Sequence, residues 1–279
     1  MLKINNDITD GFRRWLEERE YSQATVSKYL RDIRALAEYT DGVIADRGHL
    51  NGFRKYLENK GLSPSSINSM LGAVNCFMSF LGCDWKLRYL KVQRKTFLPE
   101  NKELTQREYE RMAQTAEAVG DRRLAMLLQT LCALGIRVSE LCAVTAESLD
   151  TGEAVIRNKG KLRSILIPKN LAAKLRAYCR ERGIERGQIF ITRTGKPLDR
   201  SNIWKMLKKL AALAKVPSAK VFPHNLRHLF ARTYYQKFKD IVRLADILGH
   251  SSIDTTRIYT ARSGHEERRQ LDQLRLTLE

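Results

Sequence analysis

The sequence predicts a mainly α-helical protein of two domains, a small helical one followed by a larger, mostly helical one with a small antiparallel sheet. The chain has 279 residues, which is longer than one ordinary domain. Apolar residues recur at helical spacing along most of it, whereas residues 153–167 have the pattern of a β-hairpin. With 43% hydrophobic and 29% charged residues, the composition is that of a folded protein.

Four helices are predicted in the N-terminal region. Ser63 and Pro64 begin the fourth, with serine as the N-cap and proline in the first turn, and the pattern ends near Gly82. The apolar residues at helical spacing are Ile8, Phe12, Trp15 and Leu16; Val26, Tyr29, Leu30, Ile33, Leu36 and Ala37; Leu50, Phe53, Tyr56 and Leu57; and Ile67, Met70, Leu71, Val74, Phe77, Met78 and Leu81.

A basic stretch without periodicity separates the two halves. Lysines and arginines gather around Pro99 between residues 86 and 102, which is typical of an exposed linker that lies against an anion. Thr105 and Glu108 then form a capping-box pattern at the start of a new helix. We therefore predict domains at residues 1–95 and 105–279, joined by a linker at 96–104.

The second domain mixes helices with one hairpin. Helices are expected over residues 121–134, ended by Gly135, and over 138–144. Strands at 153–157 and 163–167 should flank a turn at 158–161 that has basic residues at its tip. Further helices should begin at Leu171, at Ser201 as N-cap, near Asn225 and at Asp240, and residues 263–279 form a charged amphipathic pattern with Leu271, Leu274, Leu276 and Leu278.

The charge of the chain indicates an anionic partner, with nucleic acid as the first candidate. The net charge is +19, and residues 1–100, with 16 basic and 12 acidic side chains, contribute little of it. The longest apolar stretch, residues 124–136, is too short to span a bilayer, and the N-terminus lacks the pattern of a signal peptide. We expect a cytoplasmic protein.

The spacing of the cysteines and the absence of several common catalytic motifs argue against some classes of protein. The five cysteines, at positions 76, 83, 132, 142 and 179, have no C-x-x-C spacing and are interpreted as buried, reduced thiols. The sequence has no D-x-D, no H-E-x-x-H and no glycine-rich phosphate loop, which disfavours metal-dependent nucleases and NTPases.

Two histidines leave a choice between a metal site and a phosphate site. His224 and His228 are spaced four residues apart, as two metal ligands on one helix face would be. However, Asn225 stands where a zincin has glutamate, and no third ligand has suitable spacing. His224 and Arg227, three residues apart, can instead face one point together, although such a pair near a helix start is often only structural.

Four segments in order carry a resemblance to a known family: residues 135–141 (GIRVSEL), 224–228 (HNLRH), 248–250 (LGH) and Tyr259. Together they resemble the tyrosine recombinase (phage integrase) family, and the compact size is most similar to its Xer-like members. The resemblance is strong over residues 105–265. The first hundred residues resemble the helical, SAM-like core-binding domain of the family only in pattern.

The resemblance implies six catalytic residues: Arg137, Lys159, His224, Arg227, His250 and Tyr259. The two arginines would donate hydrogen bonds to the non-bridging oxygens of the scissile phosphate, for which a planar, permanently charged guanidinium is suited. Tyr259 would attack the phosphorus, and Lys159 would protonate the departing 5′ oxygen. His224 would act as general base or phosphate donor, and His250 would hydrogen-bond the phosphate.

Several assignments stay open at this point. The run from the turn to Pro168 is one residue longer than the family pattern, so Lys161 competes with Lys159 as general acid. Glu140 would either orient a catalytic cation or simply cap a helix. His228 is expected to support its helix start. Tyr234 and Tyr235 are rival tyrosines whose spacing fits the family badly.

The implied activity is that of a site-specific recombinase that cuts and rejoins duplex DNA through a 3′-phosphotyrosyl intermediate and a Holliday junction. It needs no cofactor, metal or ATP. The implied architecture is a C-shaped clamp that reads the major groove through helices near residues 66–80 and 201–214. A synaptic homotetramer on DNA, alone or with a partner recombinase, would be joined by the C-terminal segment, unless that segment folds back on its own domain. Two alternatives are a type IB topoisomerase-like enzyme and a catalytically idle, sequence-specific DNA-binding protein.

Overall fold

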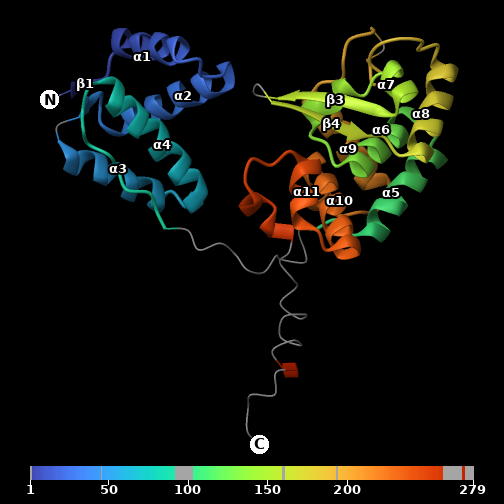
Figure 1. The fold of residues 1–279 in the computed structure, drawn as a ribbon. Helices are drawn as coiled ribbons and strands as arrows, with labels where there is room; N and C mark the ends of the chain where they lie inside the picture. The colour runs from blue at the N-terminus through green and yellow to red at the C-terminus, as the bar shows by residue number, and fades with distance from the viewer. Residues whose placement is uncertain are drawn as a thin grey trace, which may run out of the picture. The chain divides into compact units, whose positions relative to one another are not determined.

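The computed structural model describes residues 2–44, 46–91, 103–158, 161–192, 194–259 and 272–273. The chain divides into two compact units, Met1–Arg94 and Lys95–Glu279, and each is mostly helical (Figure 1). In the described residues, two antiparallel sheets of two strands each accompany the helices. The predicted fold class, mainly helical with a small antiparallel sheet, is confirmed.

The first unit contains four helices and one short strand pair. The helices are α1 (Asn6–Glu18), α2 (Gln23–Tyr39), α3 (Arg47–Asn59) and α4 (Pro64–Phe80), and β1 (Leu2–Lys3) pairs with β2 (Val43–Ile44). Each helix begins after a polar residue whose side chain accepts a backbone N–H of the first turn, namely Asn5, Ser22, Asp46 and Ser63. The predicted cap at Ser63 is therefore confirmed.

The core of this unit is apolar and rich in aromatic side chains. Phe12, Phe53 and Phe77 are fully buried, and the rings of Phe12 and Phe77 meet edge to face with centroids 5.1 Å apart. The apolar residues that predicted the four helices supply this core. Spacing along the sequence was a sufficient guide because each helix turns one apolar face inward.

Two asparagines of α4 hold the segment that follows it. Asn75 exchanges two hydrogen bonds with the backbone of Leu87, at 2.7 and 3.0 Å, and Asn68 does the same with Leu90, at 2.7 and 2.9 Å. A side-chain amide offers the same donor and acceptor as a neighbouring strand would. The first unit therefore continues past Gly82, where the helical pattern ends, and Leu87 is buried in its core.

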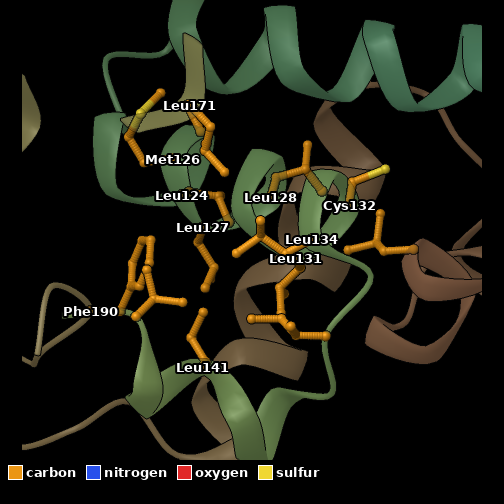
Figure 2. Close-up of a cluster of buried hydrophobic side chains, with 14 of the residues drawn as sticks. Leu124, Met126, Leu127, Leu128, Leu131, Cys132, Leu134, Leu141, Leu171 and Phe190 are labelled. Carbon is orange, nitrogen blue, oxygen red and sulfur yellow. The ribbon is translucent and has the colours of Figure 1, made fainter. Parts of the chain in front are cut away.

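The second unit is built around α6, which is buried on nearly all sides. Its elements are α5 (Gln106–Ala118), α6 (Arg122–Leu134), η2 (Val138–Ala143), α7 (Ala146–Thr151), β3 (Glu153–Asn158), β4 (Lys161–Leu166), α8 (Lys169–Arg182), α9 (Arg200–Leu213), η3 (Ser218–Lys220), α10 (Pro223–Phe238), α11 (Ile241–Leu248), η4 (Ile253–Thr255) and η5 (Arg257–Tyr259). Helices α5, α8 and α10 pack against α6. Figure 2 shows its leucines beside Leu141, Leu171 and Phe190.

The C-terminus of α6 leads directly to the candidate site. Gly135 ends the helix in the left-handed conformation, at φ 59°, as its position after the apolar run predicted. A Cβ atom there would lie 2.3 Å from the Phe230 ring, so only glycine fits. The close approach of Phe230, on α10, brings that helix against the end of α6.

Some predicted boundaries were wrong in detail. The hairpin ladder runs to the pair Asn158 and Lys161, so the strands are longer and the predicted four-residue turn is too long. Asp199, not Ser201, caps α9, because its carboxylate accepts the Asn202 N–H at 2.6 Å. The segment 138–143 is a 3₁₀ helix, and α7 was not predicted.

Two further predictions fall largely outside what the structure describes. Most of the proposed linker at 96–104, and all of the amphipathic tail except residues 272 and 273, belong to the undescribed parts of the chain. Both stay predictions. None of the described helices combines the length and apolar character that a bilayer span requires.

Candidate active site

A buried carboxylate, Glu140 in η2, lies at the centre of the candidate site. Its side chain is 3% exposed and accepts hydrogen bonds from the Arg137 backbone at 2.8 Å and the Arg137 guanidinium at 2.9 Å. Arg163 of β4 donates to it at 2.9 Å, and Arg227 lies 3.9 Å away. Burial by itself raises the pKa of Glu140, but the bonds from Arg137 and the charge of Arg163 outweigh it, so the pKa is lowered.

Arg227 of α10 is held rigidly in the interior. Its side chain is 1% exposed, and its guanidinium donates to the carbonyl oxygens of Gly135 at 2.7 Å and Leu248 at 2.6 Å. The Nε atom has no acceptor among the described residues. Burial and the neighbouring charge of Arg137 lower the pKa of Arg227 to about 10, so it remains a cation at neutral pH. An unsatisfied buried donor on a fixed cation is prepared for an anion.

His250 follows Gly249, the left-handed C-cap of α11, and is bound on both ring nitrogens. Arg227 lies 3.0 Å from Nε2, and Thr256 Oγ1 lies 2.8 Å from Nδ1. A guanidinium can only donate, so Nε2 accepts and Nδ1 carries the hydrogen that Thr256 receives. Burial and the charge of Arg227 lower the pKa of His250 to about 4, which agrees with a neutral ring at pH 7.

Tyr259 ends η5 and lies inside the same cluster. It is 4% exposed and packs with Ala231 of α10 and with Leu244 and Leu248 of α11. Its ring is stacked with His250 at 6.4 Å between centroids. Burial raises the pKa of the phenol, whereas the charge of Arg227 and a hydrogen bond with it act in the opposite direction without cancelling the rise.

The first turns of α10 add two more histidines. The rings of His224 and His228 meet at 4.5 Å, and the ring of His228 meets that of Tyr259 at 5.2 Å. Burial, followed by the charge of His224, lowers the pKa of His228 to about 4. Partial desolvation and the charges of Arg227 and Arg137 lower the pKa of His224, which is the more exposed of the two.

The electrostatics of the cluster favour an anion over a metal cation. Among the described residues, Arg137, Arg163 and Arg227 surround the single carboxylate Glu140, which leaves two positive charges uncompensated. The pKa values of the adjacent histidines are lowered, so their imidazoles are neutral at pH 7. Within the described ranges, no group of three His, Cys, Asp or Glu side chains is arranged to hold a metal ion. The arrangement can bind a phosphodiester and stabilise additional negative charge on its oxygens.

The structure brings five of the six predicted residues together. Four of them, Arg137, Arg227, His250 and Tyr259, are joined through direct contacts or through Glu140, and His224 borders them. Lys159 lies outside the described residues, and for Lys161 only the backbone is described. The contacts of Glu140 fit both alternatives, since its carboxylate caps η2 and pairs with the Arg137 guanidinium; the catalytic role of that cation stays a prediction.

Sequence reasoning missed two members of the cluster. Arg163 was assigned only to a strand, although a charged residue on the inward face of a predicted strand was a usable signal. Thr256, fully buried beside His250, lies between the 3₁₀ helices η4 and η5 and gave no signal.

The rival tyrosines and the cysteines are also placed. Tyr234 and Tyr235 lie partly buried in α10, and the ring of Tyr234 contacts Phe230 and Phe238. The cysteines are free thiols, as expected, but only Cys132 and Cys179 are buried. Cys142 is exposed, so that part of the prediction was wrong, because a 3₁₀ helix does not continue the inward face of an α-helix.

Comparisons with known proteins agree with the geometry. A family model described as the phage integrase family matches residues 102–266, and one described as the phage integrase N-terminal SAM-like domain matches residues 10–82. Tyrosine recombinase XerA of Thermococcus kodakarensis is 33% identical over 269 residues, which cover 91% of this chain and 90% of that protein. Tyrosine recombinase XerD of Listeria innocua is 29% identical over 282 residues, which cover 91% of this chain and 94% of that protein.

A solved structure supports the fold. The XerH site-specific recombinase bound to its difH substrate matches with a TM-score of 0.67 at 21% identity, over 89% of this chain and 78% of that chain. The predicted resemblance is confirmed in both units, including the N-terminal one, where it had rested on pattern alone. Because one family model spans more than half of its residues and an Xer relative matches nearly all of it, this chain belongs to the phage integrase family, among the tyrosine recombinases of the Xer type.

Proposed function

We propose that this recombinase cuts and rejoins duplex DNA with Tyr259 as its nucleophile, through a 3′-phosphotyrosyl intermediate and a Holliday junction. The observation that carries the proposal is the burial of Tyr259 against Arg227 within a cluster that has excess positive charge. Family membership favours strand exchange over the type IB topoisomerase-like and catalytically idle alternatives. The tyrosyl ester conserves the energy of the broken bond, so we infer that neither ATP nor a metal is needed.

Arg137 and Arg227 are proposed to bind the two non-bridging oxygens of the scissile phosphate. The Arg227 Nε donor has no acceptor among the described residues, and Arg137, whose side chain is 34% exposed, can reach a ligand from the surface. Glu140 accepts two hydrogen bonds from Arg137 and lies 3.9 Å from Arg227, so its negative charge is shared by both groups. Such preorganised cations stabilise the charge that develops in phosphoryl transfer.

The tyrosine requires activation, because its phenol is neutral in the free protein. The pKa of Tyr259 is raised, so attack depends on a base and on the arginines that stabilise the negative charge of the phosphate oxygens. His224 is the proposed base: its pKa is lowered, which keeps the ring neutral and able to accept a proton at pH 7. In the free protein, Nε2 of His250 accepts a hydrogen bond from Arg227. Once DNA is bound, His250 is proposed to donate a hydrogen bond to the phosphate.

A general acid is needed for the leaving 5′ oxygen, and Lys159 is the proposed one. An ammonium group with an ordinary pKa of about 10.4 is a weak acid at neutral pH, and nearby arginines would lower that value. Lys161 stays the alternative. Strands β3 and β4 pair up to Asn158 and Lys161, so only residues 159 and 160 lie between them in the sequence.

The wider assembly is proposed from the relatives. Solved structures of similar fold include XerH bound to difH and a lambda integrase dimer bound to a core site. For this protein we propose double-stranded DNA as the partner and the cytoplasm as the location. We propose a synaptic tetramer, alone or with a partner recombinase, with α4 and α9 as candidate groove-reading helices. On α9 the exposed Trp204 ring lies 5.1 Å from the Lys208 ammonium. Binding should weaken with salt, because phosphate contacts release counterions.

The test is to trap the covalent intermediate. The protein is incubated without metal with supercoiled DNA from its own genetic neighbourhood and quenched in detergent, and nucleotide-modified peptides are mapped by mass spectrometry. We expect an adduct on Tyr259 that is absent from Tyr259→Phe. An adduct on Tyr234 or Tyr235 would overturn the assignment of the nucleophile. DNA binding without any adduct or strand exchange would favour the catalytically idle alternative.

A further inference from the structure

We propose that Arg163 is a positioning residue that holds the β3–β4 hairpin against the phosphate-binding arginines, and that the action of the general acid, proposed above as Lys159, depends on it. The inference rests on the proposed function, since it concerns the hairpin lysine of that mechanism. Arg163 lies four residues after Lys159, in the part of β4 that pairs with Ile156 of β3. None of the catalytic steps proposed above uses it.

The first support is the position of Arg163 on the hairpin. Side chains alternate across a strand, and residues directly opposite each other share a face. Ile156, opposite Arg163, is buried, as are Ala154 and Ile165, whereas Val155 and Leu162 are exposed. Arg163 therefore stands on the inward face, where its pKa is lowered by burial and a charge is costly unless it is paired.

The second support is its bond to Glu140. Nη2 of Arg163 lies 2.9 Å from Oε2 of Glu140, and the two side chains are 16% and 3% exposed. The same oxygen accepts the Arg137 N–H at 2.8 Å and lies 3.9 Å from Nη1 of Arg227. One carboxylate therefore links the hairpin to both phosphate-binding arginines. An ion pair shielded from water resists displacement better than an exposed one.

The third support is the contact with Gly249. A Cβ atom at position 249 would lie 2.0 Å from Nη1 and 2.7 Å from Cζ of Arg163, so the guanidinium packs directly on the backbone before His250. Gly249 also has a φ of 64°, which few other residues adopt. Arg163 consequently contacts η2 and the turn that carries His250 while belonging to the hairpin itself. These contacts fix the hairpin on two sides.

The experiment compares two DNA substrates of identical sequence in single-turnover cleavage. In one, the scissile bond has its normal 5′ oxygen; in the other, sulfur replaces that oxygen, and the thiolate departs without being protonated. We expect Arg163→Met to slow cleavage of the oxygen substrate by about 100-fold, the effect of a misplaced catalytic group. With the sulfur substrate the variant should cleave at nearly the wild-type rate. Equal slowing on both substrates would overturn the proposal, because Arg163 would then act through the arginines or the fold.

Matched variants make this result specific. Arg157→Met removes an exposed arginine from the same hairpin and should cleave both substrates like the wild type. Arg163→Lys keeps the charge and serves if Arg163→Met folds poorly; it should show the same substrate dependence in a milder form. Thermal unfolding and DNA affinity, measured for each variant, separate loss of positioning from loss of structure.

The hairpin lysines separate failure of this inference from failure of the proposed function. Lys159→Ala and Lys161→Ala are assayed on the same substrates, and the general acid is the lysine whose loss is rescued by sulfur. If sulfur rescues Arg163→Met and Lys161→Ala but not Lys159→Ala, the positioning role stands and the assignment of Lys159 fails. If it rescues Lys159→Ala but not Arg163→Met, the mechanism stands and the positioning role fails.

Discussion

The two units of the molecule bury different kinds of side chain. The first buries apolar residues almost throughout, with Asp32 and Thr40 as its polar exceptions among the described residues. The second also buries Glu140 and Arg227, and its Tyr259 packs beside them. A buried charge is costly, and that of Asp32 is compensated by Lys28 and Arg31. The cluster around Glu140 instead holds more positive charge than it compensates, which indicates that chemistry, not packing, determined its sequence. The predictions below test this contrast, from the largest expected effect to the smallest.

The largest effect is expected at the buried cation of the second unit. Arg227→Lys keeps the charge but cannot bridge the carbonyl oxygens of Gly135 and Leu248 while it also meets a phosphate. We expect the rate of covalent cleavage to fall by about 1,000-fold or more, as when a preorganised donor is lost. Single-turnover cleavage at saturating protein measures it.

A matched control lies on the same helix. Arg232→Lys also replaces a partly buried arginine of α10, but that residue bonds to Glu103 and the Leu104 carbonyl and acts on His228 and Tyr259 only through its charge, which lysine keeps. It should cleave nearly as fast as the wild type. Comparable losses in both variants would mean that the cleavage defect reflects damage to α10 in general.

In the apolar core of the first unit, a substitution should lower the free energy of unfolding without lowering the rate of cleavage. Phe77→Ala removes a fully buried ring that contacts Phe12 and should lower the free energy of unfolding by about 3 to 5 kcal/mol. Cleavage by the fraction that remains folded at low temperature should keep its rate once DNA is saturating. Urea unfolding and single-turnover cleavage together measure the two effects. A fall in the cleavage rate constant itself would show that the units are more tightly coupled than this contrast implies.

Acid should act on the second unit through its buried histidines. His228 and His250 have pKa values of about 4 in the folded chain, below the ordinary value of about 6.5, so the unfolded chain binds protons first as the pH falls. These two histidines leave the free energy of unfolding unchanged above about pH 6.5. Between about pH 6.5 and 4 they lower it, by at most about 1.4 kcal/mol per pH unit for each histidine.

The measurement is urea unfolding at pH 7.5, 6 and 5 for the wild type and for His228→Gln. The variant should show a shallower decrease with acid than the wild type, because one of the two responsible rings is gone. Identical slopes would mean that His228 takes no part in the pH dependence.

The smallest effect is expected at the clamp that holds the segment after α4. Asn75→Ala removes two hydrogen bonds to the backbone of Leu87 and should destabilise the first unit by about 1 to 3 kcal/mol. Hydrogen exchange at the Leu87 amide should accelerate, whereas amides of the second unit should not change. Asn68→Ala provides the parallel test at Leu90.

The sequence by itself determined the features that depend on near neighbours. The apolar faces of α1 to α4, the caps at Ser63 and Thr105, and the end of α6 at Gly135 were all predicted from residues a few positions apart. These interactions recur in any helix, so local spacing carries the information. The order of the four family segments likewise pointed to the residues that gather around Arg227.

Tertiary structure alone decided how those segments meet. Arg163 and Glu140 are 23 residues apart, and the contact of Arg163 with Gly249 joins still more distant positions. Their bonds exist only because the hairpin, η2 and the end of α11 pack around one small space. Spacing in a sequence says nothing about which distant side chains share a volume, or which of them must be buried with a charge. For that reason the candidate catalytic residues could be named singly, whereas their arrangement around Glu140 could not.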